Sequence, residues 1–140
     1  MSNLYRTAAA ACVALMLMSC NAAQSTDLAE KQSVPHFHEQ FNAGNFDGIY
    51  NEATDAFRNS ASKAEYDKLM QTVRHKLGRV KSTSRQGWNV NVGTGGTQII
   101  LTYKTEFENG SGTELFAFIG SKGTAKLLHY QVNSNALITQ

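Results

Sequence analysis

Cysteine and proline are almost missing from this sequence. Its 140 residues include two cysteines, Cys12 and Cys20, and one proline, Pro35. Cys12 lies in an apolar stretch near the N-terminus that we expect to be removed, so the processed chain would keep Cys20 alone. A domain with one cysteine cannot form an internal disulfide, and it must be held together by its apolar core.

The sequence also lacks an excess of charge of one sign, and it has no long apolar run. Arg6 is the one charged residue before position 20, so the rest of the chain holds 12 Lys and Arg against 11 Asp and Glu. This near balance offers no basic surface of the kind that nucleic acids require. No stretch reaches the roughly 20 apolar residues of a membrane-spanning helix. We therefore expect no nucleic-acid partner and no membrane-spanning helix, and the length predicts one domain.

The first 20 residues have the layout of a secretion signal. Arg6 precedes an apolar run at 8–18, and the segment ends in Leu-Met-Ser-Cys at 17–20. This ending resembles the lipobox of bacterial lipoproteins, in which an aliphatic residue and a small residue precede a cysteine. The resemblance implies cleavage between Ser19 and Cys20. It also implies acylation of Cys20, which would anchor the chain to a membrane.

The same resemblance implies a destination. In such lipoproteins an aspartate after the anchoring cysteine retains the protein at the inner membrane, and this chain has Asn21 there. The implied location is the outer membrane, with the domain facing the periplasm. We interpret residues 1–19 as a lipoprotein signal peptide and residues 20–33 as a lipidated, flexible tether, because the tether is polar and shows no clear period. Residues 34–140 would form a single domain.

The first half of this domain has the apolar spacing of helices. Three segments show it: 34–43, 46–57 and 63–77. Ser33 is placed to cap the first helix, with Pro35 tolerated in its first turn. Ser62 and Glu65 have the spacing of a capping box for the third helix. The predicted buried stripe of that helix is Tyr66, Leu69, Met70, Val73 and Leu77.

Alternation of apolar and polar residues replaces the helical period after Gly78. Four strands are predicted, around 88–92, 98–108, 114–119 and 127–133. Gly87 is expected to be a bulge, and in the last strand Leu128 and Tyr130 are expected on the buried face. Short turns between successive strands predict an antiparallel meander. The predicted fold class is α+β, with N-terminal helices packed on one face of a curved four-stranded antiparallel sheet.

Several motifs resemble a family of small secreted bacterial domains of unknown function. The resemblance rests on the aromatic first helix with the Asn-Ala-Gly-Asn-Phe-Asp-Gly turn at 42–48, on the Arg-x-x-Leu-Gly ending at 74–78, and on the Phe-Glu-Asn-Gly turn at 107–110. It covers roughly residues 36–132. The resemblance implies the cone-shaped fold of nuclear transport factor 2 and ketosteroid isomerase, or the related cystatin-like fold. It implies no activity.

Two tyrosines are the strongest candidates for lining a pocket. Tyr103 and Tyr130 alternate with core residues, so we expect both to point into the cone, with Trp88 beside them. An isomerase of this fold needs a carboxylate base near such hydroxyls, and the sequence identifies no acid–base pair. Phosphate-binding loops, the Gly-x-Ser-x-Gly motif and dinucleotide fingerprints do not occur in it, so we expect no cofactor.

Charged residues near helix ends suggest structural roles. Arg74 lies in the last turn of the third helix, and we expect a structural ion pair with Glu106 or Glu114 that ties this helix to the sheet. His36 and His38 are two residues apart and therefore point to nearly opposite sides of a helix. They cannot share a metal ion, and we interpret both as solvated, with no metal site in the chain.

These features together predict an outer-membrane-anchored periplasmic lipoprotein whose domain is a non-catalytic binding or protein-interaction module. Its partner would be a small apolar ligand or an envelope protein. The alternatives are a small enzyme that uses the cone as its pocket, and an inhibitor or immunity protein of an envelope enzyme. A buried carboxylate beside the aromatic pocket would favour the enzyme. An exposed apolar sheet face around Ile100, Leu115 and Leu127 would favour a protein partner.

Overall fold

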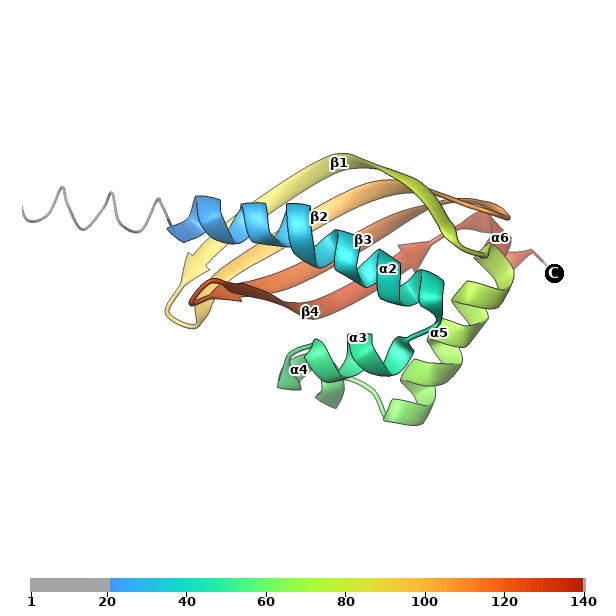
Figure 1. Cartoon of the computed structure of the whole chain (residues 1–140), viewed down its shortest axis with the longest axis horizontal. Coiled ribbons are helices and arrows are strands. Elements are labelled where there is room, and N and C mark those ends of the chain that lie inside the picture. Colours follow the sequence, from blue (N-terminus) through green and yellow to red (C-terminus); the bar gives the residue numbers. More distant parts are fainter. Residues whose placement is uncertain (1–20, 140) are drawn as a thin grey trace, which may run out of the picture.

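The computed structural model describes residues 21–139, with helices leading into a four-stranded sheet (Figure 1). The helical elements are η1 (Ala29–Ser33), α2 (Val34–Ala43), α3 (Phe46–Glu52), α4 (Asp55–Asn59), α5 (Lys63–Leu77) and α6 (Asn135–Ile138). The strands are β1 (Val80–Gly93), β2 (Gly96–Phe107), β3 (Gly110–Ser121) and β4 (Thr124–Asn133). No helix among the described residues is long and apolar enough to cross a membrane.

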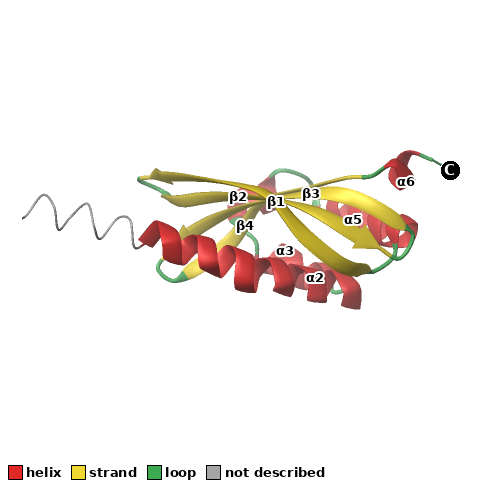
Figure 2. Ribbon diagram, turned by 90° about the horizontal axis from the view of Figure 1, so that it is seen from above, coloured by secondary structure: helices red, strands yellow, loops and turns green. Residues whose placement is uncertain are grey.

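The sheet is an antiparallel meander in the order β1-β2-β3-β4. Its core-facing side carries Ile99 and Leu101 of β2 beside Phe116 and Phe118 of β3, all at most 2% exposed. Seen from above, α2 and α3 lie on one side of the sheet (Figure 2). The α+β class predicted from the sequence is therefore confirmed.

The register of the strand pairing shifts at three places in the described sheet, at Lys81 and beside Gly87 in β1 and at Leu128 in β4. The register shift beside Gly87 in β1 confirms the predicted bulge. In β4, Leu128 is the extra residue opposite the step from Ala117 to Phe118 in β3. The extra residue turns Leu127 into the core, where it is 7% exposed. Strict alternation placed Leu128 there, and this part of the strand prediction was wrong because a bulge shifts the period by one residue.

Residues 21–43 form one helix with a π turn in its middle. The prediction of a flexible tether at 20–33 is therefore wrong for its described part. The reason is tertiary packing: Ser25 is buried against Gly120 of β3, and a Cβ atom at Gly120 would lie 2.5 Å from the Cβ of Ser25. The absence of a side chain at Gly120 is what lets the helix approach the sheet.

The π turn explains why the start of this helix was misplaced. Ser33 was expected to cap a helix beginning at Val34, yet its hydroxyl donates to the carbonyl of Ala125 in β4 at 2.9 Å. The π turn ends directly before α2, which has Pro35 in its first turn. In a regular helix the proline ring clashes with the carbonyl four residues earlier, and a widened turn relieves this.

The helix predicted at 46–57 is broken at Ala53 and Thr54. Both residues are extended, and the backbone N–H of Thr54 donates to the carbonyl of Leu127 in β4 at 2.9 Å. The hydroxyl of Thr54 accepts from the backbone N–H of Phe57 at 3.1 Å and begins α4. A hydrogen bond to the sheet thus replaces a helical one and divides the segment into α3 and α4.

Helix α5 has the predicted capping box, in which Ser62 and Glu65 each bond the other's backbone N–H. Its buried side chains are Tyr66, Met70, Val73 and Leu77. Leu69 was predicted in this stripe but is 53% exposed. Leu69 lies at the edge of the apolar stripe, and α5 packs only a narrow face against the core. The apolar period alone therefore predicts more buried residues in α5 than the structure has.

We predict that Ser62→Ala lowers the free energy of unfolding by about 0.5–2 kcal/mol, because it removes the acceptor for an otherwise unpaired helix N–H. The hydrogen bonds from Ser62 lower the pKa of Glu65. Their contribution is therefore present above the ordinary pKa of a glutamate and is lost as the pH falls through the lowered value. Urea unfolding at neutral and acidic pH measures the difference. Gln71→Ala, on the exposed side of the same helix, should leave the midpoint unchanged; an equal loss there would contradict the cap.

Candidate functional site

A buried carboxylate lies at the centre of the structure. The side chain of Glu114 on β3 is 1% exposed. Its Oε2 accepts from Nε2 of His38 on α2 at 2.8 Å and from the hydroxyl of Thr105 on β2 at 2.6 Å. Its Oε1 accepts from the hydroxyl of Tyr130 on β4 at 2.7 Å. Both carboxylate oxygens are therefore paired, by donors from three different elements.

The hydroxyl of Tyr130 is held in its protonated form. Burial, and after it the neighbouring Glu114 carboxylate, raises the pKa of Tyr130 well above its ordinary value. The hydroxyl therefore keeps its proton and donates a hydrogen bond to the carboxylate. The ring centroid of Tyr130 lies 4.6 Å from that of Phe37 and 5.2 Å from that of Phe116. Aromatic rings thus shield the carboxylate, and the cluster joins α2 to strands β2, β3 and β4.

The residues predicted to line one pocket are only partly brought together. Tyr103 and Tyr130 lie on the helix-facing side of the sheet as expected, and Tyr103 pairs across the strands with Glu114. Burial raises the pKa of Tyr103. Trp88 lies on the same face but is 62% exposed, because β1 is an edge strand that the helices leave open. The predicted set of three therefore does not surround one pocket.

Arg74 does not form the expected ion pair. Its Nη2 donates to the backbone carbonyl of Asn42 at 3.5 Å, and its buried Nε has no partner among the described residues. Glu106 pairs with Lys104 at 3.2 Å, and Glu114 is held by the cluster described above. The ion-pair prediction was wrong because each carboxylate has a closer donor within the sheet or on α2.

The outer face of the sheet is less apolar than the sequence suggested. Ile100 and Leu115 lie on this face and are half-buried. Leu127 belongs to the core on the opposite side, because of the bulge in β4. Only part of the expected apolar surface is therefore present on this face.

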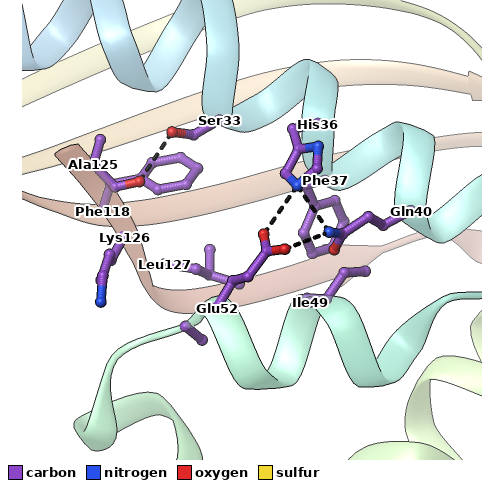
Figure 3. A pocket seen from close by; sticks show the side chains of 11 residues that line it. Ser33, His36, Phe37, Gln40, Ile49, Glu52, Phe118, Ala125, Lys126 and Leu127 are labelled. Atoms are coloured by element: carbon purple, nitrogen blue, oxygen red, sulfur yellow. Dashed lines mark hydrogen bonds and ion pairs between the residues drawn. The ribbon is translucent and has the colours of Figure 1, made fainter.

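A cavity of about 240 Å³ lies between α2, α3 and the paired strands β3 and β4 (Figure 3). Its floor is apolar and buried, formed by Phe37, Ile49, Phe118 and Leu127. The remaining lining residues are Ser33, His36, Gln40, Glu52, Ala53, Ala125 and Lys126. An apolar floor below polar side chains is the usual construction of a small-molecule site.

Three polar side chains meet at the rim of this cavity (Figure 3). Nε2 of His36 lies 2.9 Å from Oε2 of Glu52 and 2.8 Å from Nε2 of Gln40, which itself donates to Oε1 of Glu52 at 3.0 Å. One ring nitrogen cannot donate and accept at once, so His36 satisfies only one of its two contacts at a time. The side chains of His36 and Glu52 are 54% and 58% exposed, which leaves both within reach of solvent or a ligand.

Sequence reasoning missed both polar clusters. His38 was interpreted as solvated but is 8% exposed. Its partner Glu114 lies 76 positions away. The usable signal was Glu114 itself, an ionisable residue at an inward position of an apolar strand, which needs buried donors. Glu52 reaches His36 only through the packing of α3 on α2, and no local pattern encodes that contact.

Some expectations fall outside the described residues or concern metals. Ser19 and Cys20, the predicted cleavage and acylation positions, lie outside residues 21–139. Within that range, no group of three or more His, Cys, Asp or Glu side chains is placed to hold a metal ion.

We predict that Tyr130→Phe lowers the free energy of unfolding by about 1.5–3 kcal/mol, the usual contribution of a hydrogen bond to a charged group. The substitution removes the only donor to Oε1 of Glu114 among the described residues. Tyr103→Phe is the matched control on the same face, and it should cost markedly less because its hydroxyl makes no hydrogen bond to the described residues. Chemical denaturation compares the two. Equal losses, or a neutral Tyr130→Phe, would show that the carboxylate does not depend on Tyr130.

Comparison with known proteins places the chain in a family. The model of a family described as "Protein of unknown function (DUF4019)" matches residues 35–127. The matched region runs from the start of α2 into β4 and includes Glu114 with the polar rim of the cavity. No curated protein matches the chain. Because the match covers more than half of its length, this protein belongs to the DUF4019 family of proteins of unknown function.

Proposed function

We propose that this protein is a lipid-anchored envelope protein that binds a small, largely apolar ligand in the cavity between α2, α3 and β4. The observation that carries the proposal is that this cavity combines a buried apolar floor with a solvent-accessible polar rim. Sites for small molecules typically enclose about 300–1,000 Å³. At about 240 Å³ this cavity suits a ligand smaller than most drugs.

The rim indicates which polar group the ligand would carry. The Glu52 carboxylate accepts hydrogen bonds, and it already receives them from Gln40 and from His36 in its donating form. An amine or hydroxyl on the ligand could replace His36 at Oε2 of Glu52. His36 would then be free to accept from Gln40, so the rim loses no hydrogen bond when the ligand enters. We therefore assign the ligand one hydrogen-bond donor on a small apolar body.

A second hollow is a weaker candidate for this role. It lies among α4, α5 and β4 and encloses about 400 Å³. Its lining includes Leu69 and Ser60, which are exposed, together with the half-buried ring of Tyr130. Its polar lining residues Ser60, Glu65 and His129 form no hydrogen bond to one another in the described structure, so they make no joined rim that would orient a ligand.

The anchor is the second part of the proposal. It is supported by the sequence Leu-Met-Ser-Cys at 17–20 after a charged residue and an apolar run, and Asn21 favours the outer membrane. Acyl chains on Cys20 would supply stable membrane attachment. We also assign the domain to the nuclear transport factor 2-like group, supported by helices on one side of the sheet with a cavity between them.

We predict that the full chain binds N-phenyl-1-naphthylamine, an uncharged apolar dye with one N–H donor, with equimolar stoichiometry. Ala125→Phe should abolish the rise in dye fluorescence, because the new ring fills the cavity from β4. Ala61→Phe is the matched control, since Ala61 lines the other hollow. A titration of each folded variant, with circular dichroism to verify folding, measures the effect.

A second pair of variants keeps this test decisive if Ala125→Phe perturbs folding. Glu52→Ala removes the proposed acceptor at an exposed position and should weaken dye binding, whereas Glu106→Ala, also exposed, should not. Loss of binding in Ala61→Phe with retention in Ala125→Phe would move the site to the hollow beside α5. Unchanged binding in all four variants would refute the cavity as the ligand site.

We predict that Cys20→Ala prevents incorporation of labelled palmitate and leaves an uncleaved or soluble precursor, because the lipid-modified cysteine would be the substrate of the cleavage step. The sulfur of Cys20 is the atom to which the lipid would be attached. Cys12→Ala is the matched control, because this cysteine lies within the segment expected to be removed, and it should be labelled like the natural chain. Equal labelling of the Cys20→Ala chain would overturn the anchor.

A further inference from the structure

Two large apolar side chains of β1 are exposed at the same open edge of the sheet. Trp88 is 62% exposed and Val92 is 59% exposed. They are four residues apart on one strand, so both point to the helix-facing side. The helices cover the middle of that side but not its β1 edge, where Trp88 and Val92 meet solvent in the described structure.

The N-terminal helix begins its described course beside these residues. Ala22 and Ala23 line a groove of about 600 Å³ together with Trp88. Asn21 lines a neighbouring hollow of about 360 Å³ together with Val92. We call Trp88, Val92, Ala22 and Ala23 the β1 edge patch. In Figure 1 this end of the helix lies beside the turn that joins β1 to β2.

The helix is fixed to the sheet at this end. Ser25 is 9% exposed and packs on Gly120 of β3. Glu30, five residues further on, pairs with Arg85 of β1 at 2.5 Å. The chain is helical from residue 21 onward, and this helix contacts both β1 and β3. No hinge therefore separates position 21 from the β1 edge patch. A lipid on Cys20 would be attached directly before Asn21, which lines a hollow together with Val92.

Charge around the patch favours an anionic surface. Residues 86–105 and 115–126 contain no Asp or Glu, while Lys122 lies on the β3–β4 turn at the same hollow as Val92. The acids nearest in the groove are each paired, Asp27 with Lys31 and Glu30 with Arg85. Apolar side chains beside a lysine that forms no ion pair with the described residues suit the boundary between phosphate headgroups and acyl chains.

We propose that the β1 edge patch docks on the bilayer that holds the anchor, with Trp88 at the level of the headgroups. This inference rests on the anchor under Proposed function. A bilayer is favoured over a protein partner because Asn21, the first described residue, lines a hollow together with Val92, and Cys20, joined directly to it, would carry the acyl chains. Tryptophan is also the side chain most typical of membrane interfaces, since its ring is apolar and its N–H is polar.

The chain contains a single tryptophan, so its fluorescence reports this patch alone. The test uses the full chain, matured in the cell and purified with its lipid. It is reconstituted into vesicles of phosphatidylethanolamine and phosphatidylglycerol whose acyl chains are brominated near the headgroup. Trp88 emission should be strongly quenched relative to unbrominated vesicles, and it should shift to shorter wavelength relative to the unlipidated chain in buffer.

Variants separate docking from simple tethering. Val92→Asp and Lys122→Glu should reduce the quenching while the protein still sediments with the vesicles through its lipid. Leu69→Asp is the matched control, because Leu69 is 53% exposed on α5, away from the patch. It should leave the quenching unchanged.

Two outcomes with the lipidated protein overturn the docking proposal. If the lipidated protein sediments with vesicles but Trp88 is unquenched and open to acrylamide, the patch is free and only the anchor stands. If Trp88 is shielded from both quenchers, the patch is covered by protein, such as a second copy. If the chain carries no lipid, the anchor fails. Adding that chain to brominated vesicles then decides docking alone, and absent quenching refutes it.

Discussion

The buried carboxylate of Glu114 joins one helix and three strands through charge-assisted hydrogen bonds. Moving an ionised carboxylate out of water costs several kcal/mol, and the cost is offset only when its oxygens are fully paired. Here His38, Thr105 and Tyr130 supply that pairing from α2, β2 and β4. The arrangement is specific because each donor must approach from its own element. If α2 were rotated or shifted along the sheet, the buried carboxylate would lose a hydrogen-bond donor.

This constraint also sets the candidate ligand site. His38 lies on α2 between His36 and Gln40, so the rotation of α2 that directs His38 to Glu114 is the rotation that directs the other two to the cavity rim. Phe37, on the same turn, forms part of the floor and packs against Tyr130. The buried cluster and the open cavity are thus two consequences of one helix orientation, and a change in the first would be expected to disturb the second.

The long N-terminal helix connects the proposed membrane side of the molecule with the cavity. At about 1.5 Å per residue, the 15 positions from Asn21 to His36 span roughly 20 Å. Because the helix is fixed to the sheet near Ser25, this spacing is set by the fold. A ligand in the cavity would therefore be held at a defined height above a bilayer that bound residue 20. A flexible tether, as the composition of residues 20–33 suggested, would allow no such spacing.

Local signals determined what depends on neighbours in the chain: the helices 34–43 and 63–77, the Ser62–Glu65 cap, the bulge at Gly87 and the antiparallel meander. These features follow from backbone periodicity, capping and turn chemistry, which act over a few residues. Tertiary packing alone decided the rest. It brought His38 to Glu114 and Glu52 to His36, exposed Trp88 at an open edge, and made a helix of residues thought flexible. The physical reason is that a sequence pattern reports which side chains are apolar or polar, whereas burial and pairing depend on which distant element covers them.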